Sequence, residues 1–273
     1  MTDFALGDKA SAAGFRLKAF DTVGSTNAEA LALARAGDPG GLWLTSRAQT
    51  AGRGRRGRAW STEPGSLAAT ILTVVELSPE RAATLGFVAG LALDDALRQV
   101  APDLRFAIAV DGGEGAATRI RLKWPNDVLI DGMKVAGILL EAEKLNGVGL
   151  AVATGIGVNV TSAPTGVTYS AAALRDLAPG VDAPNLFRYL TDAWAGLIDV
   201  WDGGRGFPAI RQWWLERAAG IGSDIAVRVG PEVFSGVFES IDDEGRLLVR
   251  AADGSERAVT SGEVHFGVAA TTR

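Results

Sequence analysis

The sequence contains no cysteine and only one histidine, His265. A disulfide, a thiolate metal site and a cysteine nucleophile are therefore excluded. His265 alone supplies neither a Ser-His-Asp triad, which also needs a serine and a carboxylate beside it, nor a zinc site, which needs further ligands. His265 lies in the run GEVHFG near the C-terminus, where we expect an ordinary strand residue.

The sequence also lacks a long apolar run and an excess of positive charge. No uninterrupted apolar segment approaches the roughly 20 residues that span a bilayer, and the first residues show no pattern of a secretory signal. Lysine and arginine number 27 against 32 aspartate and glutamate, a net charge of −5. This balance disfavours a general polyanion-binding protein. With 47% hydrophobic residues, we expect a globular cytoplasmic protein without a membrane partner.

Positive charge is nevertheless concentrated in one short run, GRGRRGRAW at residues 52–60. Its glycines let the backbone approach a ligand closely, and its guanidinium groups suit phosphate or carboxylate. The pattern alone fits a solvated loop, an RNA-contacting segment or a cradle for a compact polyphosphate. The following WSTEPGSLAAT adds no basic or aromatic extension, which disfavours nucleic acid.

Hydrophobic patterning predicts an α+β domain built on a mixed, mainly antiparallel sheet. A helix is expected within 25–37, with Thr26 and Glu29 as a capping box and Gly37 as its stop. A second, long helix is expected over 78–100, with Ser78 as the cap and Pro79 in the first turn. Further helices are predicted at 185–201 and 207–220. The predicted strands are 16–23, 41–49, 66–75, 104–110, 118–124, 128–132, 134–144 and 147–160, with a glycine-rich loop at 111–117.

The pattern changes near residue 220 to short alternating strands separated by Gly, Asp and Pro turns. Strands are expected at 223–229, 233–242, 246–253 and 255–266. We expect a small SH3-like β-barrel there. The predicted domains are 1–220 and 221–273.

Two further segments carry candidate functional residues. In KWPNDVLIDGMKVAGILLE, Pro125 starts a turn, Asn126 and Asp127 order a loop, and Lys134 begins the next strand. This segment is either a plain hairpin or one that presents Asp127 and Lys134 to a cleft. In GIGVNV, the amide of Asn159 either reads a nucleobase edge or caps a turn.

Taken in order, these segments resemble the biotin protein ligases. The resemblance rests on STN, QTAGRGRRGRAW, KWPNDV, KVAGILLE and GIGVNV and covers roughly residues 16–268. Because the first strand begins about fifteen residues in, we expect no N-terminal DNA-binding domain of the bifunctional repressor members, and no DNA partner. Ala59 departs from the pattern, since many members carry lysine there.

The resemblance implies two half-reactions. Biotin attacks the α-phosphate of ATP to give biotinyl-5′-AMP, and a lysine of a biotin carboxyl carrier protein, as in acetyl-CoA carboxylase, then takes the biotinyl group. It implies ATP and Mg²⁺, without naming the metal ligands, and it is compatible with a homodimer. Two anions must meet in the first step, so we expect fixed cations to promote it. The catalytic candidates are Arg55, Arg58, Lys134 and, as the base for transfer or a ribose or metal contact, Asp127.

The resemblance also implies which residues bind the substrates. Those implied for biotin are Ser25, Thr26, Asn27, Gln49, Arg53, Gly54, Arg55 and Lys134. Those implied for ATP and the adenylate are Gly52, Arg55, Arg58, Trp60, Asn126 and Asn159. Trp60 is expected to pack on adenine.

Two alternative functions stay open from the sequence. A lipoate or octanoate ligase shares the fold and the acyl-adenylate chemistry, although Gln49 and the arginine run favour biotin. A nucleic-acid-binding module would use the arginine run and the terminal barrel, but the net acidity speaks against it. The barrel also suits carrier recognition as an auxiliary role.

Overall fold

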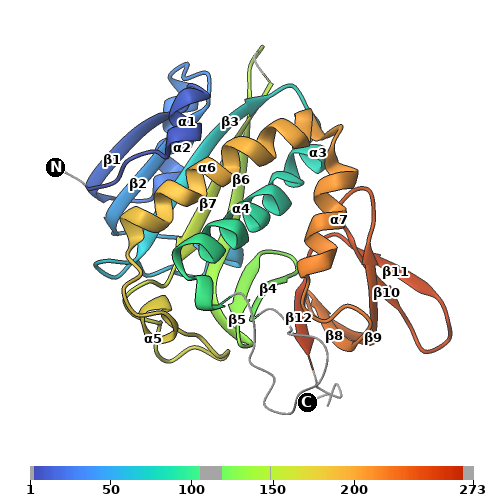
Figure 1. The fold of residues 1–273 in the computed structure, drawn as a ribbon. Helices are drawn as coiled ribbons and strands as arrows, with labels where there is room; N and C mark the ends of the chain where they lie inside the picture. The colour runs from blue at the N-terminus through green and yellow to red at the C-terminus, as the bar shows by residue number, and fades with distance from the viewer. Residues whose placement is uncertain (1–2, 105–118, 148, 267–273) are drawn as a thin grey trace.

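The computed structural model describes residues 3–104, 119–147 and 149–266 and contains two β-sheets (Figure 1). The larger sheet and its helices form the main body, and the smaller sheet stands at the C-terminal end of the chain (Figure 1). The predicted strand 104–110 and the glycine-rich loop 111–117 lie outside the described residues, except for Leu104 in a short 3-10 turn.

The larger sheet has seven strands in the order β1-β2-β3-β7-β6-β5-β4. Only β1 and β2 run parallel, so the predicted mixed, mainly antiparallel sheet is confirmed. The strands are β1 Arg16–Val23, β2 Leu42–Gln49, β3 Leu67–Val75, β4 Ile120–Lys123, β5 Asp127–Ile130, β6 Met133–Leu145 and β7 Gly149–Val158.

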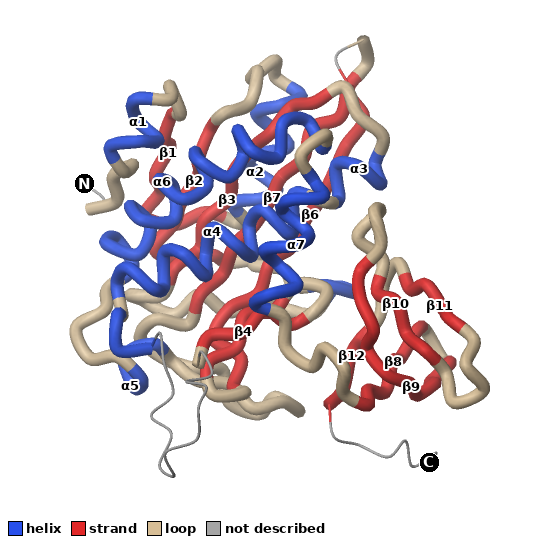
Figure 2. The backbone as a smooth tube through the Cα atoms, turned by 45° about the vertical axis from the view of Figure 1, so that its right-hand side comes forward, coloured by secondary structure: helices blue, strands red, loops and turns tan. Residues whose placement is uncertain are grey.

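Helices cover both faces of this sheet (Figure 2). Successive side chains of a strand point to opposite faces, so Leu42 and Leu44 pack with α2, Thr26–Arg35, while Trp43 packs on the other side. There the fully buried Trp43 ring makes edge-on contacts with Phe187, at 5.6 Å between centroids, and with Trp194, at 5.9 Å. The helices of that face are α4, Leu85–Val100, and α6, Ala183–Trp201.

The start of α2 differs from the prediction. Ser25, not Thr26, is the N-cap: its Oγ accepts a hydrogen bond from the Ala28 N–H at 3.4 Å. The hydroxyl of Thr26 donates instead to Gln49 Oε1 at 3.1 Å. The capping box was wrong because the neighbouring strand offers Thr26 a tertiary partner. Gly37, at φ 95°, ends the helix as expected.

The long helix expected over 78–100 is two helices. Ser78 caps α3, Pro79–Ala83, as predicted. The helix is interrupted at Thr84. The hydroxyl of Thr84 donates to the Arg81 carbonyl at 2.6 Å and accepts from Trp201 Nε1 at 2.8 Å. A threonine hydroxyl that bonds to a preceding carbonyl competes with the helix ladder, and the buried indole of Trp201 fixes it there.

The smaller sheet has five antiparallel strands in the order β11-β10-β9-β8-β12. The strand expected over 255–266 is in fact two, separated by a turn. The buried Trp124 of the main body donates through Nε1 to the Gly245 carbonyl at 3.1 Å, which ties the two sheets together. The strands are β8 Asp224–Val229, β9 Glu232–Ile241, β10 Leu247–Arg250, β11 Glu256–Val259 and β12 Glu263–Phe266.

Three helical elements complete the fold. The predicted helix 207–220 is α7, Phe207–Arg217, and it leads into the smaller sheet. The short helices α1, Asp8–Ala12, and α5, Leu174–Leu177, have too few residues for a periodic pattern and were not predicted. Among the described residues, no helix is both long and apolar enough to cross a membrane.

A buried ion cluster fastens α7 to α4. The side chain of Asp94 has no exposed surface and accepts from Arg98 at 2.8 and 3.0 Å, and it pairs with Arg217 Nε at 2.9 Å. Breaking a buried ion pair from one side leaves an uncompensated charge. The connection between the main body and the smaller sheet therefore rests partly on this carboxylate.

We expect Asp94→Asn to lower the free energy of unfolding by about 3 kcal/mol, because Arg98 and Arg217 lose the buried carboxylate that they share, although Arg217 keeps Asp95 at 3.4 Å. Urea denaturation followed by circular dichroism measures the change. The control is Glu143→Gln, which breaks the exposed pair with Arg35 and is expected to cost less than about 1 kcal/mol. Equal losses in the two variants would contradict the role assigned to Asp94.

Candidate active site

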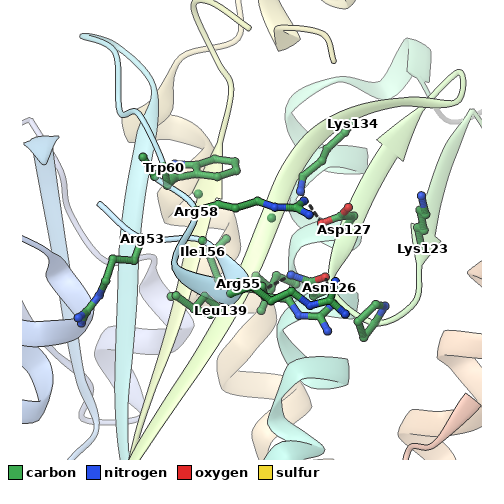
Figure 3. Close-up of a pocket in the computed structure, with 18 of the residues that line it drawn as sticks. Arg53, Arg55, Arg58, Trp60, Lys123, Asn126, Asp127, Lys134, Leu139 and Ile156 are labelled. Atoms are coloured by element: carbon green, nitrogen blue, oxygen red, sulfur yellow. Dashed lines mark hydrogen bonds and ion pairs between the residues drawn. The ribbon is translucent and has the colours of Figure 1, made fainter. Parts of the chain in front are cut away.

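A cleft of about 390 Å³ opens between the larger sheet, the arginine run and the edge of the smaller sheet (Figure 3). The start of α2 and the end of β2 form one end of it. The β4–β5 hairpin and β12 form the other end, and residues 53–60 lie across it. Segments far apart in the sequence thus share one site.

The floor of the cleft is a glycine-rich apolar patch on the α2 face of the sheet. Gly155 and Gly157 of β7 lie beside Leu139 and Gly137 of β6. The indole of Trp60 lies against this patch, and a Cβ atom at Gly157 would overlap it. Glycine is required there because the ring approaches the backbone so closely.

A β-bulge turns Lys134 into the cleft. The pairing of β5 with β6 shifts between Val128 and Leu129, which leaves one extra residue in β6 between Lys134 and Gly137. Side chains alternate along a strand, so the extra residue brings Lys134 to the same face as Gly137. Its Nζ is 2.6 Å from Asp127 Oδ1 and lies between the rings of Trp60 and Tyr169, at 5.8 and 5.2 Å from their centroids.

The β4–β5 hairpin adds a second lysine to the same face. Lys123 is paired directly with Asp127, which is itself paired with Gly137 of β6. Cross-strand partners share a face, so Lys123, Asp127 and Lys134 all reach the cleft, with Asp127 between the two lysines (Figure 3). Burial lowers the pKa of Lys123, the positive charge of Lys134 lowers it further, and the opposing pull of Asp127 does not restore it.

The arginine run forms a small hairpin over the cleft. The Gly54 N–H donates to the Arg58 carbonyl at 2.7 Å, and the Trp60 N–H donates to the Gly52 carbonyl at 2.9 Å. Its tip is a 3-10 turn in which Arg56 adopts φ 57° and Gly57 adopts φ 72°. These left-handed conformations reverse the chain and separate the guanidinium groups.

Each guanidinium of the run already has a partner in the protein. Arg53 pairs with Glu141 at 3.1 Å, and Arg56 pairs with Glu263 of β12 at 3.2 Å, with Arg58 in shorter contact with the same carboxylate. Arg55 donates to Asn126 Oδ1 at 3.1 Å and to the Gly262 carbonyl at 3.3 Å. Burial lowers the pKa of Arg55, because a charged guanidinium loses hydration when it is held in the cleft.

The electrostatic balance of the cleft is positive. Its lining includes six lysine and arginine side chains but two carboxylates, Asp127 and Glu263. Burial acts to raise the pKa of Glu263, but the charges of Arg58 and Arg56 outweigh it and lower that pKa overall. Burial also lowers the pKa of His265, with Lys123 adding to the effect. The cleft suits a polyanion.

The opposite end of the cleft is lined mainly by neutral polar side chains and is bordered by the Arg53–Glu141 ion pair. Gln49 Oε1 accepts from the Thr26 N–H at 2.9 Å, and Thr70 Oγ1 lies 2.8 Å from Thr26 Oγ1 and 2.7 Å from Asn27 Oδ1. Asn27 Nδ2 donates to Glu141 at 3.0 Å. This network fixes the directions of several donors and acceptors beside the apolar floor, as a neutral polar ring requires.

The structure brings together all but two of the predicted site residues. Gly52 and Asn159 do not line the cleft. Gly52 supports the hairpin, while the amide of Asn159 donates to the Ala172 carbonyl at 3.4 Å. The residues that do line it are Ser25, Thr26, Asn27, Gln49, Arg53, Gly54, Arg55, Arg58, Trp60, Asn126, Asp127 and Lys134.

Sequence reasoning missed four residues at or beside the cleft: Lys123, Glu141, Tyr169 and Glu263. Lys123 stands in the KWPND segment, where strand alternation by itself predicts only that it lies on a polar face. Glu263 follows the arginine run by some two hundred residues, and no local pattern links them. The run at 52–60 contains four arginines and no carboxylate, which predicts that acidic partners lie in distant parts of the sequence.

Comparison with known proteins places this architecture in a class. The family model described as "Biotin/lipoate A/B protein ligase family" matches residues 25–159. A structure of biotin protein ligase from Aquifex aeolicus in complex with biotin and ATP superposes with a TM-score of 0.70 at 24% identity, covering 92% of this chain and 97% of that one. The fold is therefore that of the biotin and lipoate protein ligases.

Two curated relatives narrow the class. A biotin--[acetyl-CoA-carboxylase] ligase from Paracoccus denitrificans is 41% identical over 89% of this chain and 97% of its own length. One from Mycobacterium tuberculosis is 37% identical over 95% of this chain and 93% of its own. The model "Biotin protein ligase C terminal domain" matches residues 220–267. The chain belongs to the biotin protein ligase family.

The contact of Glu263 with the arginines predicts a pH-dependent stability. Because the pKa of Glu263 is lowered in the folded protein, its contribution is complete above the ordinary glutamate pKa of about 4.3 and is lost as the pH falls through the lower, folded value. We expect wild type to exceed Glu263→Gln in stability by about 1 kcal/mol or less at pH 7, since the side chains are partly exposed.

Denaturant midpoints of the two proteins between pH 3 and pH 7 measure the difference, which should shrink below about pH 4. Glu244→Gln removes an exposed carboxylate from the turn between β9 and β10 and controls for net charge. A wild-type advantage that is independent of pH would contradict the predicted ion contact.

Proposed function

We propose that the protein activates biotin with ATP to form biotinyl-5′-AMP and then transfers the biotinyl group to a lysine of the biotin carrier of a carboxylase. The observation that carries the proposal is one cleft that joins an end of mainly neutral polar side chains to a cationic region, with six lysine and arginine side chains in its lining. The relatives named as biotin--[acetyl-CoA-carboxylase] ligases support the same substrates.

In this proposal the neutral end of the cleft holds the ureido ring of biotin. Ser25, Thr26, Asn27 and Gln49 supply donors and acceptors, and the glycine floor accommodates the apolar part of the molecule. The partners of these side chains within the protein fix their directions before the ligand arrives, which lowers the ordering cost of binding. Arg53 and the backbone at Gly54 close this end.

The cation cluster then overcomes the repulsion between two anions. An oxygen of the biotin carboxylate forms a bond to the α-phosphorus, the bond from that phosphorus to the bridging oxygen breaks, and the electron pair leaves with pyrophosphate. In this proposal Lys134 and Arg55 hold the carboxylate and the α-phosphate, and Arg58 lines the same cleft. Fixed positive charge in a partly buried cleft stabilises the charge that builds up in this step.

Trp60 supports a place for the adenine base. Its indole lies on the glycine floor, and Lys134 Nζ is 5.8 Å from its ring centroid, so an adenine that stacks on Trp60 would lie next to Lys134. Asn126 borders the same region, with its Oδ1 already held by Arg55. Asn159 and Gly52 stay predictions as nucleotide contacts, because both lie behind the lining.

Asp127 is the proposed base of the second step. A carrier lysine has an ordinary pKa near 10.4 and must lose a proton before its nitrogen attacks the mixed anhydride. The nitrogen then bonds to the biotinyl carbonyl carbon, and AMP leaves with the electron pair. The carboxylate of Asp127 lines the cleft and lies 2.6 Å from Lys134, so it reaches the reacting region.

Mg²⁺ would accompany the triphosphate and neutralise charge on the leaving group. Among the described residues, no three His, Asp or Glu side chains converge to hold an ion by themselves. Magnesium sites that share substrate phosphates need only one or two carboxylates, and Asp127 and Glu263 fit that role. We place the reaction in the cytoplasm because it consumes ATP. Pairing with a second copy stays a prediction, which analytical ultracentrifugation tests.

The test of the function is an intact-mass measurement. Purified protein is incubated with ATP, Mg²⁺, an unmodified carrier domain and either biotin or lipoate. We expect one biotinyl group on a single carrier lysine. A shift with lipoate alone would move the protein to the lipoate ligases. No shift with either acid would overturn the proposal and return attention to nucleic-acid binding, which a salt-sensitive gel shift would reveal.

The role of Lys134 is tested separately. We expect Lys134→Met to lower biotin-dependent exchange of pyrophosphate into ATP by about 100-fold or more, because one fixed charge at the reacting centre is lost. Lys144→Met makes the same change on an exposed part of β6 and should leave the rate unchanged. A normal exchange rate in Lys134→Met, with a normal melting temperature, would refute the assigned role.

A further inference from the structure

Among the described residues of the cleft lining, the ammonium of Lys123 differs from the other cations in having neither a carboxylate nor a neutral oxygen at contact distance. Among the described residues, Arg53, Arg56, Arg58 and Lys134 each form an ion pair with a carboxylate. The ammonium of Lys123 forms none, and its recorded contact is with the ring of Phe266, 5.2 Å from its centroid. Arg55 likewise lacks a carboxylate partner but is held by two neutral oxygens.

A half-buried ammonium without a partner is costly to maintain. Burial lowers the pKa of Lys123 and Lys134 lowers it further, while the attraction of the more distant Asp127 and Glu263 offsets this only in part. The side chain cannot turn to the other face of the sheet, because the strand pairing of Lys123 with Asp127 holds it on the cleft face. Such a charge is offset when an anion of the substrate arrives, which adds binding energy at that point.

The position of Lys123 identifies which part of the substrate it meets. It lies on the far side of Asp127 from Lys134, toward the smaller sheet (Figure 3). Glu263 and Phe266 both belong to β12, so Lys123 and the pair Arg56 and Arg58 flank the same strand. An anion that extends from Lys134 past Arg55 toward β12 therefore ends next to Lys123.

We propose that Lys123 is a further substrate-binding residue that holds the pyrophosphate portion of ATP and stabilises it as the leaving group. This inference rests on the proposed function, in which Lys134 and Arg55 hold the reacting α-phosphate. Lys123 supplies charge at the opposite side, where the breaking bond releases its electron pair. Phosphoryl transfer runs roughly in line, so the attacking and leaving oxygens need cations on separate sides.

The experiment compares wild type with Lys123→Met, Lys123→Arg and the control Lys144→Met. Isothermal titration calorimetry measures the binding of inorganic pyrophosphate and, separately, of biotin without nucleotide. We expect Lys123→Met to weaken pyrophosphate binding and to raise the KM for ATP, each about tenfold, since a charge-assisted hydrogen bond is lost. Biotin binding should stay as in wild type, and Lys123→Arg, which keeps the charge, should stay within about threefold.

Unchanged pyrophosphate binding in Lys123→Met would overturn the proposal. So would a higher KM for the carrier domain alone, which would place Lys123 at the carrier instead. An equal loss in Lys123→Arg would also contradict it, because the charge would then not be what matters. Pyrophosphate binding does not require turnover, so a failure of the proposed ligase activity in wild type would be seen separately.

Discussion

The mutual repulsion of positive charges in one cleft is the constraint on which the rest of this structure depends. Six cations converge there, and without counter-charges they would drive the arginine hairpin away from the sheet. Glu141 of the sheet and Glu263 of the smaller sheet hold three of the arginines, while Asp127 holds Lys134. The protein's own carboxylates thus neutralise cations that the phosphates of the substrate would otherwise neutralise. Because Glu263 belongs to the smaller sheet, this arrangement requires that the two sheets stay joined.

A second constraint is space. The cleft exists because one face of the central strands carries glycine where the opposite face carries large apolar side chains. Gly155 leaves room for the amide of Asn27 and Gly157 leaves room for Trp60, whereas Ile156 between them packs into the core beneath α4 and α6. Alternate positions of one strand therefore shape the cleft and fill the core, because neighbouring side chains of a strand point to opposite faces. Enlarging a residue on the open face blocks the site, while shrinking one on the other face weakens the core.

Much of the fold and of the site could be predicted from local pattern. The strands Arg16–Val23 and Leu42–Gln49 and the glycine stop at Gly37 follow from alternation and turn chemistry. The predictions failed where a distant group intervened. Trp201 bonds to Thr84 at a helix break, and Gln49 draws the Thr26 hydroxyl away from a capping role. In each case a tertiary hydrogen bond outweighs a local preference of comparable energy.

By itself the sequence determined the chemistry available to this protein: cations and amides in a fixed order, without cysteine and with a single histidine. The order of these motifs was enough to indicate the family. Only the tertiary structure decided which charges meet. The bulge in β6 turns Lys134 into the cleft, the hairpin register adds Lys123 beside Asp127, and β12 delivers Glu263. The physical reason is that electrostatic and hydrogen-bond partners are selected by distance in space, which strand pairing sets and sequence separation does not reveal.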